Sequence, residues 1–456
     1  MTTAIERLAG FALDTRYDQL PQSVIAQVKR LTIDTLGCAL GALDCGPAKI
    51  AESLIGAAQA DDAASVIGSG ARTTAAGAAM VNGALTRYLD FMDVYWSKDI
   101  CHPSENIPVA LALTQARRGS GKQLIEAIVI GYEAQLRLCD TINLRDLGLH
   151  HATAAGFVVP LMAGKIWGLD ITQTAHACAL GGARHLTVGA MSRGRLSMAK
   201  AIGYPMSAME TLFSTRLAAH GLTGPLQALD FLLHEMPSRH PLPESAALDL
   251  KRAAYVLERV SLKRFPVQFE LQGPVEIAAR LHRALKVNGG VAAIESIVIE
   301  VLPLAKERTA DAAKFRPANR ETADHSLPCC VAMALIDGEL TPHQFEADRW
   351  RDADVAELMA KIQVEPSADF ERRLRSGRPA AIALKLRDRT TLREVEEVPP
   401  GDAARPLDDA ALEQKFRSLA EPALGAVRSG EVLRCVARLD QLEDVAELMV
   451  LLKSAP

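Results

Sequence analysis

The stretch from Tyr88 to Pro108 concentrates side chains that could exchange protons with a bound molecule. It holds three carboxylates, one histidine and two bulky aromatics, namely Asp90, Asp93, Asp99, His102, Tyr95 and Trp96. The chain as a whole is only 4% aromatic, so this composition is unusual. Taken singly, each carboxylate could cap or solvate a helix end, and the histidine could form a local hydrogen bond. Their concentration in one connection between helices favours a functional site.

Two adjacent histidines form a second group of titratable residues. His150 and His151 follow a Gly-Leu pair and precede a predicted helix. Adjacent residues on a helix point about 100° apart, so both imidazoles are not expected to face one centre. We expect one of the two to act in a site and the other to cap a helix or face solvent, and the sequence leaves open which.

Cationic side chains gather in two further segments. Arg193, Arg195 and Lys200 fall within eight residues that lead into a long helix. Lys263 and Arg264 follow later, where the pattern of the chain changes from helical to mixed. A buried lysine needs an anionic partner, which the carboxylate of a substrate would supply. The alternative is a solvated, positively charged lead-in to the helix.

These groups together predict proton-transfer chemistry on a small polyanion. A base would remove a proton α to a carboxylate while an acid assists departure of the β-group, and cations would hold the carboxylates. Gly119-Ser-Gly-Lys122 lacks the earlier glycine and the Ser/Thr of a phosphate loop, and no dinucleotide fingerprint follows a predicted strand. Eight cysteines without a Cys-x-x-Cys spacing argue against zinc and iron–sulfur sites. We expect neither a metal nor a cofactor.

Composition limits the partners of the protein. The 456 residues are 49% hydrophobic and 23% charged, which is ordinary for a globular protein of two or three domains. A net charge of −4 gives no electrostatic reason to expect nucleic acid or an anionic membrane as a partner. No basic leader with an apolar run begins the sequence, and charged residues interrupt every apolar stretch. We therefore expect a cytoplasmic protein that does not enter a membrane.

The elements that position these groups are mostly helices. Apolar periodicity predicts helices at 3–14, 21–43, 48–59, 74–88, 107–117, 120–142, 152–168, 171–184, 198–220 and 226–235, with one short strand at 65–68. After an extended segment from residue 256, the patterns predict helices at 273–286, 321–336 and 351–362, strands at 294–302 and 361–366, and a hairpin at 380–397. Helices return at 408–420 and 428–453.

The predicted fold is mainly α. A large all-helical domain is expected to be discontinuous in sequence, with residues 1–266 and 404–456 on either side of a smaller α+β domain at 267–403. The boundary between two such domains is a common place for a binding cleft.

Several motifs, in order along the chain, resemble the MmgE/PrpD family, which includes 2-methylcitrate dehydratase, cis-aconitate decarboxylase and an iminodisuccinate epimerase. They are Leu89-Asp90-Phe91-Met92-Asp93, His102-Pro103-Ser104, Gly148-Leu149-His150-His151, Ser197-Met198-Ala199-Lys200, Phe265-Pro266-x-x-Phe269 and Arg320-Glu-Thr-Ala-Asp-His-Ser-Leu-Pro328. The resemblance implies a homodimer in which the α+β domain is a lid over an active site that needs no metal. It also implies that Asp90, His102 and one of His150 and His151 lie in that site, where the histidines exchange protons and Lys200 binds a carboxylate.

The chain departs from the family pattern at positions that would touch the substrate. Val94 stands in place of a threonine, Glu270 and Gln272 stand where relatives commonly carry a histidine, and Cys329 replaces an aromatic residue. The residues expected to bind substrate are Asp93, Arg193, Arg195, Lys263, Arg264, Gln272 and Cys329.

The sequence predicts a metal-independent lyase of the 2-methylcitrate dehydratase type, which eliminates water from a small hydroxy-di- or tricarboxylate. Two alternatives stay open. One is a decarboxylase or epimerase of the same family, and the other is a catalytically degenerate relative that only binds a metabolite.

Overall fold

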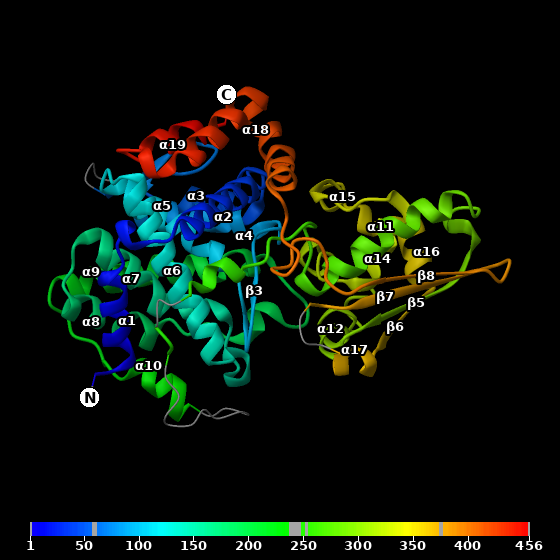
Figure 1. Ribbon diagram of the computed structural model, residues 1–456, viewed down its shortest axis with the longest axis horizontal. Coiled ribbons are helices and arrows are strands. Elements are labelled where there is room, and N and C mark those ends of the chain that lie inside the picture. The colour runs from blue at the N-terminus through cyan, green and yellow to red at the C-terminus, as the bar shows by residue number, and fades with distance from the viewer. Residues whose placement is uncertain (1, 57–61, 237–247, 251–253, 374–376, 455–456) are drawn as a thin grey trace.

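The computed structural model describes residues 2–56, 62–236, 248–250, 254–373 and 377–454. Two bodies lie side by side along the long axis of the molecule (Figure 1). One is helical and holds both chain ends, and the other carries a sheet of four strands covered by helices. The predicted fold class, mainly α with a smaller α+β part, is confirmed.

The helical body is built around one continuous hydrophobic core. Its helices are α1 (Ala4–Asp14), α2 (Gln22–Leu40), α3 (Gly46–Leu54), α4 (Ala75–Tyr88), α5 (Asn106–Ala116), α6 (Gly121–Thr141), α7 (Ala155–Trp167), α8 (Ile171–Arg184), α9 (Gly203–Ala219), α10 (Ala228–Asp230), α18 (Asp409–Ala437) and α19 (Ala446–Leu451). Helix α5 is buried on every side from Asn106 to Gln115, as expected for a helix inside a large core. No helix in the described ranges is long and apolar enough to cross a membrane.

The predicted helices of this body agree with the observed ones except at a few ends and at 428–453, which is divided between α18, ending at Ala437, and α19, beginning at Ala446. Helix α3 stops at Leu54, and residues 57–59 of the predicted helix lie outside the described residues. The predicted strand at 65–68 is instead β1 (Ala63–Ser65), which pairs antiparallel with β2 (Arg72–Thr74). Helix α18 continues past residue 420 and is kinked at Gly425, whose φ is 74°.

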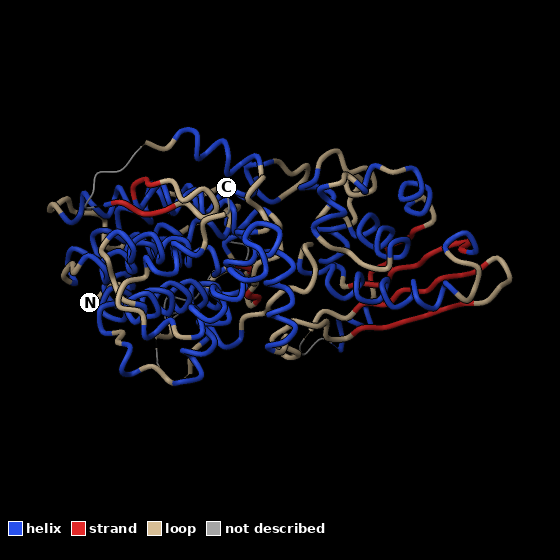
Figure 2. The backbone as a smooth tube through the Cα atoms, turned by 90° about the horizontal axis from the view of Figure 1, so that it is seen from above, coloured by secondary structure: helices blue, strands red, loops and turns tan. Residues whose placement is uncertain are grey.

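The α+β body is organised around a sheet with the strand order β6-β5-β7-β8. Its strands are β5 (Ile294–Val301), β6 (Ile362–Pro366), β7 (Ala380–Leu386) and β8 (Thr391–Glu396). Strands β5 and β6 run parallel and the other neighbours are antiparallel, so the predicted hairpin at 380–397 is confirmed. The helices are α11 (Gln272–Lys286), α12 (Pro303–Thr309), α13 (Arg320–Ala323), α14 (Leu327–Asp337), α15 (Pro342–Glu346), α16 (Ala353–Met359) and α17 (Ala368–Arg373). Figure 2 shows the long strands confined to this body.

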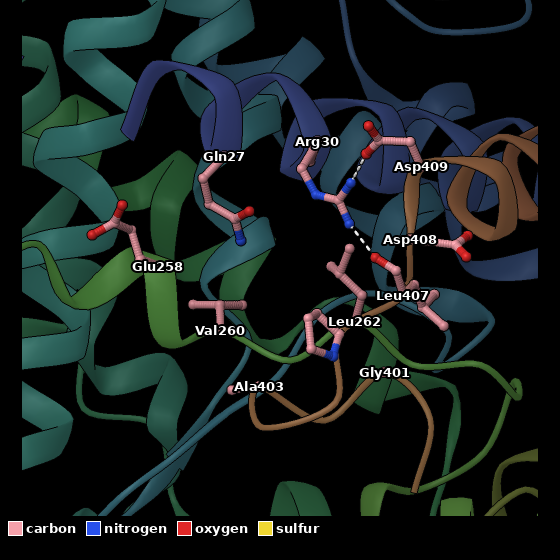
Figure 3. A pocket seen from close by; sticks show the side chains of 11 residues that line it. Gln27, Arg30, Glu258, Val260, Leu262, Gly401, Ala403, Leu407, Asp408 and Asp409 are labelled. Atoms are coloured by element: carbon pink, nitrogen blue, oxygen red, sulfur yellow. Dashed lines mark hydrogen bonds and ion pairs between the residues drawn. The ribbon is translucent and has the colours of Figure 1, made fainter. Parts of the chain in front are cut away.

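The chain crosses between the two bodies along neighbouring segments. The amide of Leu262 donates to the main-chain oxygen of Gly401 at 2.8 Å. Only glycine suits position 401, because its φ is 92° and a Cβ would lie 1.9 Å from the oxygen of Leu262. A cavity of about 410 Å³ opens beside these crossings, where Arg30 of α2 pairs with Asp409 and donates to the oxygen of Leu407 (Figure 3).

Two hydrophobic cores correspond to the two bodies. One contains Leu262 and Leu407, and the other begins at Phe265 and extends to Leu386. The division into residues 1–266 with 404–456 and residues 267–403 stays a prediction, which these separate cores support.

Candidate active site

Asp90 is the centre of a buried ion-pair network. It follows the end of α4, and its backbone lies in the left-handed region with a φ of 52°. This conformation is unfavourable for residues other than glycine. Arg87 Nη1 donates to Asp90 Oδ1 at 2.6 Å, and Lys263 Nζ lies 3.2 Å from the same oxygen and 2.8 Å from the main-chain oxygen of Asp90. Burial opposes ionisation, but Lys200, Lys263 and Arg87 hold the pKa of Asp90 well below its usual value.

Lys200 extends this network across the boundary between the two bodies. Its Nζ lies 3.2 Å and 3.3 Å from the two carboxylate oxygens of Asp324 and 3.8 Å from Asp90 Oδ2. His325 is also within reach, with Nδ1 3.4 Å from Lys200 Nζ and in contact with Asp324 Oδ1. Burial lowers the pKa of Lys200, and the two carboxylates oppose that shift. The predicted need of a buried Lys200 for an anion is therefore met by protein carboxylates.

His102 is anchored to the main chain through one ring nitrogen. Its Nδ1 lies 2.8 Å from the main-chain oxygen of Asp93, and because a carbonyl oxygen only accepts, Nδ1 carries the proton. Nε2 is then left with its lone pair. Burial lowers the pKa of His102 well below its usual value, aided by Arg87 and Lys263. The neutral ring is thus a base whose reactive nitrogen is fixed.

The Asp93 carboxylate holds the turn that carries His102. Oδ1 accepts from the amide of Ser104 at 3.0 Å, and Oδ2 accepts from the hydroxyl of Tyr132 at 2.8 Å. Burial raises the pKa of Asp93 to about 7. This side chain was predicted to bind substrate, but in the structure its oxygens are bonded within the protein.

His151 faces His102, with the ring centroids 5.3 Å apart. Its Nε2 lies 3.0 Å from Glu105 Oε2, and its Nδ1 is buried with no hydrogen-bond partner among the described residues. Burial raises the pKa of Glu105 to about 8, so this acid is mostly protonated at neutral pH. Arg87 joins the histidine pair to the ion-pair network, since its Nε lies 3.8 Å from Glu105 Oε1 while its Nη1 donates to Asp90.

The two adjacent histidines do not diverge as expected. Their ring centroids are 4.0 Å apart, because His150 lies in extended backbone just before the 3₁₀ turn His151–Ala154. His150 Nδ1 accepts from the amide of Ala152 at 3.3 Å and so caps this turn. The histidine that faces His102 is therefore His151.

Three potential metal ligands meet in the network, but lysine ammonium groups already pair with its carboxylates. Ligand atoms of Asp90, Asp324 and His325 lie within 4.8 Å of one another. Lys200 and Lys263 place their ammonium groups on these same carboxylates. A divalent cation would have to displace them against charge repulsion, so the donor set suits an all-protein ion-pair network.

The other predicted substrate-binding residues are engaged elsewhere or exposed. Within the described part of the chain, the Gln272 amide bonds main-chain groups, with Oε1 3.0 Å from the amides of Arg264 and Phe265 and Nε2 donating back to the oxygen of Phe265. Cys329 is fully buried in the second core, where burial raises its pKa to about 12. Arg264 lies 3.6 Å from Glu276, and Arg193 and Arg195 are exposed.

Sequence reasoning missed several members of the site. They are Arg87, Glu105, Asp324 and His325. Arg87 precedes Asp90 by three residues at a helix end, a spacing that brings side chains together. The pair Asp324-His325 lies inside a motif that was matched to the family, so its charge pattern was available as a signal.

Two family models match the chain. The MmgE/PrpD N-terminal domain matches residues 6–231, and the MmgE/PrpD C-terminal domain matches residues 265–441. Together these matches span most of the sequence. The chain belongs to the MmgE/PrpD family, as its motifs indicated.

Named relatives are similar over nearly their whole length. Human cis-aconitate decarboxylase is 26% identical over 95% of this chain and 91% of its own length. The cis-aconitate decarboxylase of Aspergillus terreus strain NIH 2624 is 24% identical over 98% of this chain and 95% of its own. The 2-methylcitrate dehydratase of Escherichia coli K12 is 27% identical over 90% and 89%. These relatives are lyases, which supports an enzyme of this family.

Proposed function

We propose that the protein is a metal-independent lyase that eliminates water from a small hydroxy-di- or tricarboxylate, in the manner of 2-methylcitrate dehydratase. The observation that carries the proposal is the pairing of His102 with His151, whose rings lie 5.3 Å apart and differ in which nitrogen is bonded to the protein. Such an asymmetric pair can serve as base and acid in a single elimination.

His102 would begin the elimination. Its Nε2 takes the proton α to a substrate carboxylate, and the electron pair left on that carbon forms the new C=C bond as the β C–O bond breaks. His151 Nδ1 gives its proton to the departing hydroxyl, which leaves as water. Glu105, whose pKa is raised to about 8, passes its own proton to His151 Nε2. Transfer of the proton from His102 to His151 Nδ1, while the Nε2 proton of His151 passes back to Glu105, restores the starting state.

The ion-pair network would hold the substrate carboxylates. Four cations of the network, Arg87, Lys200, Lys263 and Arg320, face the ionised carboxylates of Asp90 and Asp324. Because Glu105 is mostly protonated, positive charge is in excess and a polyanionic substrate would balance it. Lys200 is the expected carboxylate ligand, and it would exchange part of its contact with Asp324 for the substrate.

Decarboxylation is the second candidate, because two of the relatives described above are cis-aconitate decarboxylases. The same cations can hold the carboxylates of cis-aconitate while a histidine delivers a proton to the carbon that loses CO₂. Epimerisation and binding without catalysis are not favoured by any of the relatives named above.

Direct assays separate these candidates. Purified protein is incubated with 2-methylcitrate, citrate and cis-aconitate, each with and without a chelator, while absorbance of the conjugated alkene and release of CO₂ are recorded. We expect alkene formation from a hydroxy-tricarboxylate without CO₂, and the same rate with chelator. Release of CO₂ from cis-aconitate, with no turnover of the two hydroxy acids, would favour the decarboxylase over the dehydratase. No turnover of any of the three substrates would contradict both proposals.

We also propose that the protein is a homodimer. Large apolar side chains are exposed on α9, the adjoining turn Met198–Ala201 and α3, including Phe213 at 65% and Leu54 at 80% exposure. Helix α9 contacts this turn and the turn contacts α3, so these side chains lie on neighbouring elements. Light scattering after size exclusion should give the mass of two chains, and Phe213→Asp should give one. A monomeric wild type would contradict the proposal.

A cytoplasmic location is proposed as well. All eight cysteines are buried free thiols, which suits a reducing compartment. Fractionation of the native host, with the protein detected by antibody, tests this location.

A further inference from the structure

Trp96 of β3 (Tyr95–Trp96) meets two arginines of the α+β body. The guanidinium carbon of Arg378 lies 3.8 Å from the centroid of the Trp96 ring, and that of Arg308 lies 5.1 Å away. Arg308 Nη1 is 3.2 Å from Glu270 Oε1. We call Trp96, Glu270, Arg308 and Arg378 the Trp96 cluster. It joins an aromatic face of the helical body to two cations and one carboxylate.

Two buried polar atoms of the Trp96 cluster lack a hydrogen-bond partner among the described residues. Glu270 is 4% exposed, and its Oε2 is buried and unbonded. Arg378 Nε is likewise buried and unbonded, while Nη1 of the same side chain donates to the main-chain oxygen of Gly377 at 2.9 Å. Burying an acceptor and a donor unpaired is unfavourable, and such atoms in a native structure call for a ligand or another explanation.

The Trp96 cluster adjoins the candidate active site. The amide of Gln268 donates to the main-chain oxygen of Asp324 at 3.0 Å, and its side-chain oxygen accepts from the amide of Glu270 at 2.7 Å. On the other side, Trp96 packs with Val94, which directly follows the residue whose carbonyl holds His102. One short segment therefore connects Glu270 to the ion-pair network.

We propose that the Trp96 cluster is a substrate-selecting subsite for a carboxylate that carries a hydrogen-bond donor on the adjacent carbon. The carboxylate would accept from Arg378 Nε and lie near Arg308, and the donor, a hydroxyl or an ammonium group, would bond Glu270 Oε2. Both unpaired atoms are then satisfied by one end of one molecule. The inference rests on the proposed function, since it names the end of the substrate that is recognised beside the elimination centre.

A ligand series on the wild-type protein tests the subsite without turnover. Succinate, malate and aspartate are dicarboxylates that differ only in carrying no donor, a hydroxyl or an ammonium group on the carbon next to one carboxylate. Isothermal titration should show malate or aspartate binding about tenfold more tightly than succinate, because a hydrogen bond to a buried charged group is worth about that factor. Whichever of malate and aspartate binds more tightly shows whether the subsite prefers a hydroxyl or an ammonium donor. Equal affinities for all three would overturn the proposal.

Variants locate the selectivity in the Trp96 cluster. Glu270→Ala should reduce the preference over succinate to within about twofold, and Arg378→Gln should weaken all three ligands about tenfold. Arg351→Gln is the matched control. Arg351 also stacks on a tryptophan, with its guanidinium carbon 4.4 Å from the Trp350 centroid, but it is exposed and lies outside the Trp96 cluster. Unchanged selectivity in Glu270→Ala would overturn the inference. Selective binding without turnover of any substrate would contradict the proposed function and leave the subsite standing.

Discussion

His102 donates its Nδ1 proton to the main-chain oxygen of Asp93 at 2.8 Å, and this bond decides which ring nitrogen can accept a proton from a substrate. The partner is a peptide carbonyl rather than a carboxylate, so this hydrogen bond adds no full negative charge to stabilise the imidazolium. Burial then keeps the pKa of His102 low and the ring neutral. The Asp93 side chain braces the same turn through Ser104 and Tyr132, which makes the orientation of the ring independent of the substrate.

Replacing His102 with asparagine should abolish turnover and leave the fold intact. The asparagine amide can still donate to the oxygen of Asp93, but no basic nitrogen is left, so kcat should fall by about 100-fold or more. The check is initial rates on the substrate found active, with melting temperature measured in parallel. His282→Asn is the matched control, since His282 Nδ1 makes the same kind of bond to the oxygen of Leu335 at 2.9 Å. A His102→Asn enzyme with more than a tenth of the wild-type rate would contradict the assignment.

Glu105 should make the wild-type protein less stable as pH rises. Its pKa is raised from 4.5 to about 8, so between these values the unfolded chain loses the proton while the folded chain keeps it. The contribution of Glu105 to the free energy of unfolding is therefore largest below about pH 4.5. It falls by up to about 4 kcal/mol as the pH approaches 8. Glu105→Gln cannot ionise, so the difference in unfolding free energy, variant minus wild type, should grow from pH 5 to pH 8 in urea titrations. A pH-independent difference would show that Glu105 is ionised in the folded protein.

Lys200 and Asp324 should be strongly coupled in stability. Removing one partner leaves the other charge buried, so Lys200→Met and Asp324→Asn should each cost about 3–5 kcal/mol. The double variant should cost at least about 1 kcal/mol less than the sum, measured by urea unfolding. The exposed pair Lys385 and Glu295, 2.8 Å apart on the sheet, is the control and should couple by at most about 1 kcal/mol. Additive effects of Lys200→Met and Asp324→Asn would mean that the two charges do not depend on each other.

The sequence predicts the fold well because its signals are local. Apolar periodicity defines helices such as α6, which begins with a capping box at Ser120, and strand alternation defines β5. The errors lie at element ends and at breaks inside two predicted helices: 321–336 is divided between α13 and α14, and 428–453 between α18 and α19. Helix α18 runs through Pro422 and Gly425 because α2 packs along it, and that tertiary contact is not visible in the local pattern.

The site is predicted only in part, because burial and long-range pairing decide the roles of its residues. Asp90, His102 and Lys200 were singled out from their motifs, and the structure brings Asp90 and Lys200 to 3.8 Å. Asp324 and His325 complete the network from more than a hundred residues away, which spacing cannot reveal. Arg193 and Arg195 had the right charge but are exposed, and charge alone does not distinguish a solvated arginine from a ligand.

Lys415 connects the returning C-terminal segment to the active site. Its Nζ lies 2.6 Å from Asp34 Oδ1 on α2, 2.7 Å from the oxygen of Phe91 and 2.8 Å from the oxygen of Lys263. All three donors of the ammonium group are therefore used. The bond to the main-chain oxygen of Lys263 positions that residue, whose own side chain binds Asp90.

Lys415→Met should destabilise the protein and disturb the site together. The change leaves Asp34 buried without its cation and two main-chain oxygens without a donor, so we expect a loss of about 3–5 kcal/mol and a lower kcat. Asp34→Asn in the same chain should restore part of the stability, because it removes the unpaired charge, but not kcat, because Lys263 stays unsupported. Lys29→Met is the control, since Lys29 also links α2 to α18 through the oxygen of Ala437 and pairs with Asp440, but at a more exposed position. Urea unfolding and initial rates on the four proteins decide between this account and one in which Lys415 only fills space, for which Lys415→Met would be neutral.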